Sequence, residues 1–181
     1  MKWVTKDFVH LDRVATPWLI KRFVDRDAQF VFVPWDRLHE APADATPFAL
    51  EGAELGPHDA TGTTFAKALR KYDLHDPGLA RMARVIDAGV RCAVHGDRAG
   101  VDDTDGQIAV GLLAISEGIM ASTADDDQVL AASFPIYDAL YADFRVRAIV
   151  ATEGIVVPKP GRAGPGDKVR LLRALYARAT S

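Results

Sequence analysis

The feature that most constrains the fold is a β-like run that meets a helix start with almost no loop between them. In the segment Val4–Asp12, the apolar residues Val9 and Leu11 alternate with polar ones, and this period of two predicts a strand with one polar face. Thr16 and Pro17 follow closely, in the pattern of a helix N-cap and a proline at the first helical position. We therefore expect a strand that leads almost directly into a helix.

A second β-rich run and several helices complete the expected fold. Phe30–Val33 has strong β propensity and is closed by Pro34, so we expect it to pair beside the first strand as part of a βαβ-like unit. Proline, glycine and apolar spacing then predict an irregular stretch over 36–62, two helices within 62–90, a linker over 91–103, a helix over 106–119, a helical stretch from 125 to about 151 interrupted at Pro135, a connector over 154–166 and a last helix over 167–179. The prediction is a helix-rich α+β fold with a small N-terminal β-sheet, in a single domain over residues 1–181.

The composition excludes several function classes. With 22 basic and 25 acidic side chains among 181 residues, the formal net charge is −3, so no positive field attracts nucleic acid or an anionic membrane. No stretch approaches the roughly 18 apolar residues of a membrane span. Cys92 is the only cysteine, which rules out internal disulfides and a cysteine-rich zinc site and suits a reducing compartment. We expect a cytoplasmic protein without nucleic-acid or membrane partners, able to form a homo-oligomer.

The densest group of chemically capable residues is His10, Asp12 and Arg13. In a strand, His10 and Asp12 share one face, and a His-x-Asp pair at a strand end can ligate a metal ion or orient a general base. The alternative is structural, in which the two side chains bond each other and Arg13 as an ion network.

Two further positions are candidates for the same site. His58 lies in the irregular stretch, a plausible place for a second metal ligand or a base, although a lone loop histidine is usually exposed and idle. The run Asp102–Gly106 resembles part of a calcium loop but lacks the required first and last ligands. Asp103 or Asp105 is therefore expected to cap the following helix, and Asp105 could also supply a carboxylate to the N-terminal site.

A long set of residues also resembles a known family. It comprises Trp3–Lys6, His10–Ala15, Pro17–Phe23 and Phe32–Pro34, with looser agreement at His58, Thr64-Phe65, Leu74–Leu79 and Gly111–Ile115. These residues resemble the C-terminal domain of the chromate-resistance ChrB family, over most of the chain and most closely in its first quarter. The resemblance implies a domain from chromate-resistance clusters, whose longer members are chromate-responsive regulators with an added N-terminal portion.

The chain departs from that family pattern in ways that bear on its chemistry. It begins at the shared domain, which favours a free-standing catalytic or ligand-binding domain over a self-contained regulator. The family commonly has a cysteine at the place of Thr16 and a Cys-Thr-Phe-Glu run at the place of Thr63–Ala66. The absence of those thiols argues against chromate reduction or thiolate capture and favours oxygen and nitrogen ligands.

These observations lead to three hypotheses. The first is a metal-dependent enzyme of lyase or hydrolase type on a small organic or oxyanion substrate. The second is a non-catalytic oxyanion sensor or accessory domain of a chromate-resistance system, which binds chromate or sulfate through the same basic residues. The third is a structural or interaction protein.

The first hypothesis assigns a role to each candidate residue. The cofactor is a divalent ion, Mn, Fe or Zn, held by oxygen and nitrogen ligands. The expected roles are metal ligation for His10, His58, Asp12 and Asp105; catalysis for Arg13, Asp12 and Lys21; and substrate binding for Arg22, Trp3, Trp18 and Phe8.

Overall fold

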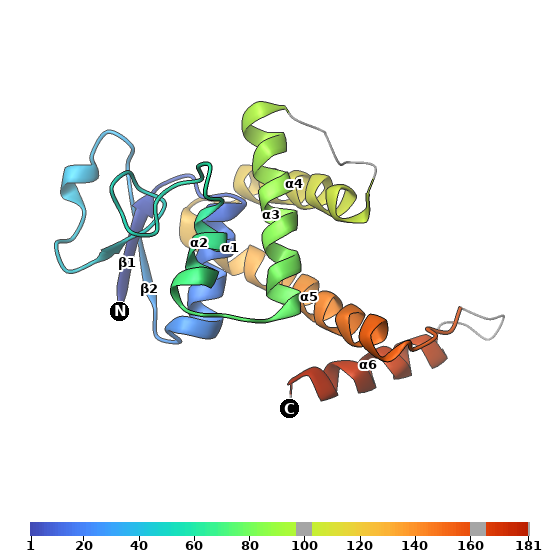
Figure 1. Cartoon of the computed structure of the whole chain (residues 1–181). Coiled ribbons are helices and arrows are strands. Elements are labelled where there is room, and N and C mark those ends of the chain that lie inside the picture. The colour runs from blue at the N-terminus through green and yellow to red at the C-terminus, as the bar shows by residue number, and fades with distance from the viewer. Residues whose placement is uncertain (97–102, 160–165, 181) are drawn as a thin grey trace.

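The N-terminal third of the chain forms a small parallel sheet backed by helices. The computed structural model describes residues 1–96, 103–159 and 166–180, so parts of the predicted linker 91–103 and connector 154–166 lie outside it. Strands β1 (Lys2–Lys6), β2 (Gln29–Val33) and β3 (Thr46–Pro47) have the order β2-β1-β3, and both pairings are parallel. Figure 1 shows this sheet at one side of the molecule and the helices beside it. The predicted helix-rich α+β fold with a small N-terminal sheet is confirmed.

The pairing of the first two strands follows from their apolar runs. In the register of β1 and β2, Val4 lies opposite Val31 and Lys6 opposite Val33. The crossover between them contains α1 (Asp12–Leu19) and a π-helical turn, η1 (Ile20–Val24). A parallel pair needs such a crossover, and a helix usually supplies it. The predicted βαβ-like unit is therefore confirmed.

The first strand is shorter than predicted. It ends at Lys6, and the backbone then turns through left-handed conformations at Phe8 (φ 55°) and Leu11 (φ 43°). Asp12 already begins α1, so Pro17 lies inside the helix and the expected N-cap at Thr16 is wrong. The alternation of apolar and polar residues continues past Lys6, but contacts with distant residues fix the backbone there in a conformation that is not a strand.

The remaining helices are close to those predicted, and two boundaries differ. They are α2 (Thr64–Lys71), α3 (Pro77–His95), α4 (Thr104–Ser122), α5 (Asp126–Glu153) and α6 (Gly166–Thr180). Helix α3 continues through 91–95, where a linker was predicted. Helix α5 is unbroken at Pro135. A proline inside a helix costs about 3 kcal/mol, and burial of Leu130, Ser133 and Tyr137 on both sides of Pro135 stabilises the helix against that cost. Asp103 caps α4 by accepting from the Gly106 N–H over 2.7 Å, as one of the two predicted caps.

One core joins the sheet to the helices. Its largest fully buried side chains include Trp3, Trp18, Phe65, Tyr137 and Phe144. In Figure 1, α5 runs from beside α1 past α3 and continues to α6 near the C-terminus. Within the described ranges, no helix has both the length and the apolar character needed to cross a membrane.

Candidate functional site

An open cavity of about 260 Å³ lies where the N-terminal segment, the loop before α2 and the end of α3 meet. Its location follows from the parallel sheet, because residues after the carboxyl ends of adjacent strands flank one crevice. Lys6 ends β1, and Trp35 follows β2 by two residues. The polar residues that line the cavity are Lys6, His10, Asp12, Arg13, His58 and Thr64. Four predicted site residues, His10, Asp12, Arg13 and His58, thus share one cavity.

Arg13 holds the segment between β1 and α1 in its unusual shape. Its Nη1 donates to the carbonyls of Lys6 and Asp7 over 3.0 and 2.9 Å, and its Nη2 donates to the Phe8 carbonyl over 2.9 Å. Left-handed backbone at residues other than glycine costs on the order of 1 kcal/mol. The guanidinium offsets that cost by bonding three successive carbonyls.

Helices α4 and α5 fix the same segment from the other side. Asp126, in the first turn of α5, accepts from the Phe8 and Val9 N–H groups over 2.9 and 2.8 Å. The Leu11 N–H donates to Ser116 Oγ over 3.0 Å, and the Tyr137 hydroxyl donates to the Leu11 carbonyl over 3.2 Å. His10 and Asp12 are therefore positioned by residues more than 100 positions away in the sequence.

Both carboxylate oxygens of Asp12 are occupied by hydrogen bonds within the protein. At the start of α2, the N–H groups of Thr64 and Phe65 donate to its Oδ2 and Oδ1 over 2.8 and 2.9 Å. The Thr16 hydroxyl also donates to Oδ1 over 3.3 Å. Burial raises the pKa of Asp12, and the hydrogen bonds from α2 oppose that rise. Asp12 lies in the first turn of α1 and at the start of α2, so its charge interacts with the positive ends of two helices.

His10 lines the cavity with a largely buried imidazole. Burial, followed by the nearby Arg13 charge, lowers the pKa of His10, and Glu117 acts in the opposite direction. Its Nδ1 is buried and has no hydrogen-bond partner among the residues that the structure describes. A buried nitrogen without a partner is uncommon and marks a position where a ligand or water completes the hydrogen bonding.

The cationic side chains of the cavity share the indole of Trp35. The Lys6 ammonium lies 3.9 Å from the ring centroid, and the Arg13 guanidinium carbon lies 5.8 Å from it. Neither cation forms an ion pair with a carboxylate of the described residues. The Arg13 charge nevertheless interacts with Asp126, Asp7 and Asp12, so Lys6 is the less compensated of the two cations.

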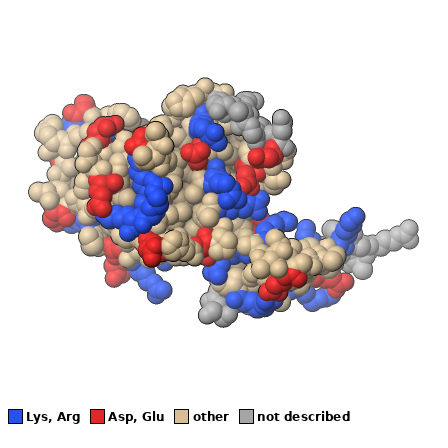
Figure 2. Space-filling view, viewed as in Figure 1, with Lys and Arg blue, Asp and Glu red and all other residues tan. Residues whose placement is uncertain are grey.

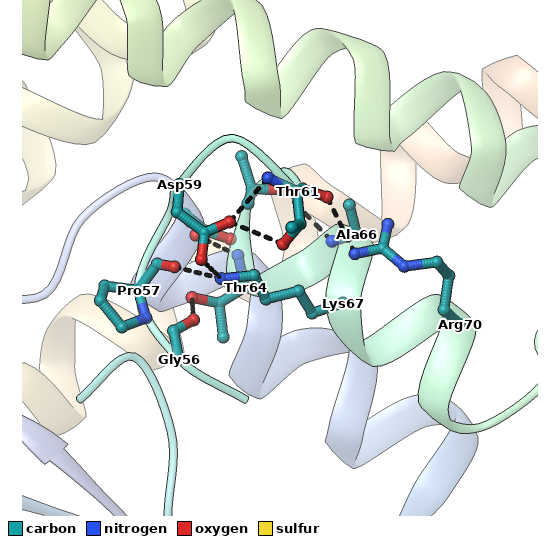
Figure 3. Close-up of polar contacts among 10 residues, drawn as sticks. Gly56, Pro57, Asp59, Thr61, Thr64, Ala66, Lys67 and Arg70 are labelled. Carbon is teal, nitrogen blue, oxygen red and sulfur yellow. Dashed lines mark hydrogen bonds and ion pairs between the residues drawn. The ribbon is translucent and has the colours of Figure 1, made fainter. Parts of the chain in front are cut away.

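His58 is positioned through both of its neighbours in the sequence. Figure 3 shows the Lys67 ammonium of α2 reaching the Pro57 carbonyl and the Asp59 carboxylate, the latter over 2.8 Å. The Thr64 hydroxyl donates to the Gly56 carbonyl over 2.9 Å in the same close-up. This loop and α2 form a unit that places His58 at the cavity, with its ring centroid 6.4 Å from that of His95.

The predicted aromatic substrate wall is not brought to this cavity. Trp3 is buried and donates from Nε1 to Asp25 over 3.3 Å, and Trp18 is buried and donates from Nε1 to Asp138 over 2.8 Å. Phe8 is 67% exposed and lines a separate groove beside the start of α5. Trp35, which no sequence motif indicated, is the aromatic residue of the cavity.

The other predicted charged residues also lie elsewhere. Lys21 donates to the Ala28 carbonyl over 2.8 Å, and Arg22 forms a bidentate pair with Asp138 over 2.9 and 2.7 Å. Asp105 pairs with Arg81 over 2.7 Å and with Arg84 over 3.3 Å, between α4 and α3. None of the three lines the cavity.

Sequence reasoning missed Lys6, Trp35 and the α3 residues that complete the cavity. The positions of Lys6 and Trp35 could have been predicted, because both residues lie at the carboxyl ends of two paired parallel strands. Val90, Ala93 and Val94 carry no such signal. Part of this wall fell in the predicted linker, and only the packed helix shows which side chains face the cavity.

The comparisons with known proteins identify related sequences. The family model described as ChrB, C-terminal domain, matches residues 3–144. Protein ChrB of Cupriavidus metallidurans CH34 is 30% identical over 144 residues, which are 79% of this chain and 40% of that relative. The chain thus spans less than half the length of that relative. No solved structure matches the chain.

The prediction of a metal-dependent lyase or hydrolase is wrong. Across residues 1–96, 103–159 and 166–180, no group of three or more His, Cys, Asp or Glu side chains is arranged to hold a metal ion. Of the expected ligands, Asp105 is paired with arginines outside the cavity and Asp12 is occupied by α2. The family match and the relative name a ChrB domain, and neither names an enzyme. The same residues fit the non-catalytic alternative better.

Proposed function

This chain belongs to the ChrB C-terminal domain family, and from that premise we propose that it is a non-catalytic oxyanion-binding domain, a sensor or accessory domain of a chromate-resistance system. Its ligand is chromate or sulfate, bound in the cavity beside β1. The observation that carries the proposal is the Lys6 ammonium, which lines this cavity beside Arg13 and forms no ion pair with a carboxylate of the described residues.

The balance of charge in the cavity favours an anion. Asp12 is the carboxylate among the lining residues, and its oxygens accept from Thr64, Phe65 and Thr16. The Lys6 ammonium keeps its donors for a ligand, whereas Arg13 contributes mainly charge, because its terminal nitrogens are bonded to carbonyls. A hydrogen bond to a charged group contributes about 1.5–3 kcal/mol.

Two further polar side chains line the cavity. The Nδ1 of His10 is buried without a partner among the described residues, so it is not exposed to an ion in the open part of the cavity. His58 is a second imidazole of the same cavity. The volume of about 260 Å³ is several times the ~30 Å³ that a water molecule occupies in the liquid, so the cavity as a whole has room for a tetrahedral ion.

The proposal is tested by replacing the Lys6 charge and measuring sulfate binding by calorimetry. Sulfate has the shape and charge of chromate and does not oxidise Cys92. We expect Lys6→Met to weaken sulfate binding at least about tenfold, equivalent to about 1.4 kcal/mol. The matched control is Lys2→Met, on the same strand, whose ammonium pairs with Asp44 over 2.8 Å.

Thermal unfolding gives an independent readout, because a ligand that binds the folded state raises the melting temperature. Sulfate and chromate should stabilise the wild type and Lys2→Met, and chloride at equal ionic strength should not. Equal sulfate affinity for wild type and Lys6→Met, or no binding to either, would show that the cavity is not an oxyanion site.

A further inference from the structure

The cavity has an apolar side that a bare inorganic ion leaves unused. We infer that it accepts an organic oxyanion, a small molecule that carries a sulfonate or carboxylate group on a compact apolar body. The inference rests on the proposed anion site, which binds the charged group, and adds the class of molecule to which that group is attached.

The apolar wall is built mainly by the end of α3. Val90, Ala93 and Val94 have the spacing i, i+3 and i+4, so they lie on one face of the helix. All three line the cavity, and Val94 is 55% exposed. Val90 is buried, whereas Ala93 and Val94 are exposed, and exposed apolar side chains beside polar groups are a frequent sign of a ligand site.

Trp35 connects the apolar and the cationic ends of the cavity. Its side chain is 58% exposed although it lies against the Lys6 ammonium, 3.9 Å from the ring centroid. A ligand whose anionic group pairs with Lys6 therefore has its body within reach of the indole. Leu11, Ala49 and Pro57 add further apolar lining.

The two ends have different ligand requirements. A tetrahedral ion is hydrated on every side that does not contact a donor, and it gains nothing from valine side chains. An apolar group attached to the anion displaces water from those side chains, which is favourable in proportion to the apolar area covered. An organic anion of matching length fills both ends at once.

Many basic side chains elsewhere on the described surface are paired with carboxylates. Figure 2 shows Lys and Arg side chains interspersed with Asp and Glu over the visible face. Arg81, Arg84 and Arg147 line another hollow, but each is paired with an aspartate, Asp105 or Asp143. Lys6 and Arg13 differ because their charge faces an apolar wall without a carboxylate pair among the described residues.

The test compares three probes on the wild-type protein by calorimetry: sulfate, methanesulfonate and benzenesulfonate. We expect benzenesulfonate to bind at least about tenfold tighter than methanesulfonate, since only the aryl group reaches the apolar wall. Benzenesulfonate should also quench the fluorescence of Trp35, because Trp3 and Trp18 are buried, and Trp35→Phe should remove that signal.

The decisive variant is Val94→Ser, with Val156→Ser as its matched control. Val156 is 88% exposed and does not line the cavity. Val94→Ser should remove most of the advantage of benzenesulfonate over methanesulfonate and leave sulfate affinity unchanged. Val156→Ser should change neither.

The outcomes separate this inference from the proposed function. If all three probes bind in a manner that depends on Lys6 but benzenesulfonate has no advantage, the inference is wrong and the oxyanion site stands. An advantage that Val94→Ser leaves intact also overturns it, because the aryl group then lies elsewhere. If no probe binds, both the inference and the proposed function fail.

Discussion

Replacement of Asp12 is the most direct test of how this site is held together. Asp12→Ala removes the acceptors for the buried N–H groups of Thr64 and Phe65. These are the first two amides of α2 and have no partner within that helix. Each buried donor left unpaired costs about 1–3 kcal/mol, and removal of a buried charge recovers part of the total. We expect a net loss of about 2–4 kcal/mol in the free energy of unfolding.

The assay is urea unfolding at neutral pH, with the slope on denaturant used to verify that both proteins unfold in the same way. Thr63→Ala is the matched control, since the Thr63 hydroxyl accepts from the Ala66 N–H over 3.2 Å at the same helix start. Loss of that cap should cost about 1 kcal/mol. A loss for Asp12→Ala no larger than for Thr63→Ala would refute the assignment of Asp12 as the shared cap.

Two further predictions concern the segment around His10. Burial lowers the pKa of His10 in the folded state, so the unfolded chain takes up more protons as the pH falls, and stability should be full above about pH 6.5 and decrease below it. His10→Gln should make this decrease smaller in urea unfolding between about pH 8 and pH 5. An unchanged decrease would contradict the assignment to His10. Asp126→Ala should lose about 2 kcal/mol of stability, because the Phe8 and Val9 N–H groups lose their acceptor. Asp127→Ala, in the same turn but exposed, should change it by less than about 0.5 kcal/mol, and equal losses would show that Asp126 acts only through the helix end.

The parts of the fold that sequence predicted are those with a local physical cause. The apolar run Phe30–Val33 pairs as a strand, and Asp76-Pro77 starts α3 where an N-cap and a first-turn proline belong. Thr16-Pro17 has the same kind of pattern but lies inside α1. The difference is that α1 begins at Asp12, where the contacts to α2 are made.

Only part of the site was predictable, namely the meeting of His58 with the N-terminal segment. The order of elements was sufficient to expect that the loop before α2 brings His58 to the N-terminal segment, and both line one cavity. Partners of long charged side chains are not encoded locally. Arg22 finds Asp138, 116 positions away, and Asp105 finds Arg81, 24 positions away. Pairs between residues this far apart produce no recognisable spacing in the sequence. The sequence therefore could not show that Arg22 and Asp105 are engaged by other side chains and do not reach the cavity.

The contact between Asp12 and α2 bears on both the metal hypothesis and the proposed anion site. A His-x-Asp pair can bind a metal ion only where the carboxylate is directed at that ion together with other ligands, and no such group of three is found among the described residues. Here the start of α2 occupies both oxygens of Asp12, so the negative charge of Asp12 is balanced by two amides and by the positive ends of two helices. Lys6 forms no ion pair with a carboxylate of the described residues, whereas the Arg13 charge interacts with Asp126, Asp7 and Asp12. Asp12 therefore acts as the cap of α2, and the unpaired Lys6 ammonium is the group on which the proposed oxyanion site rests.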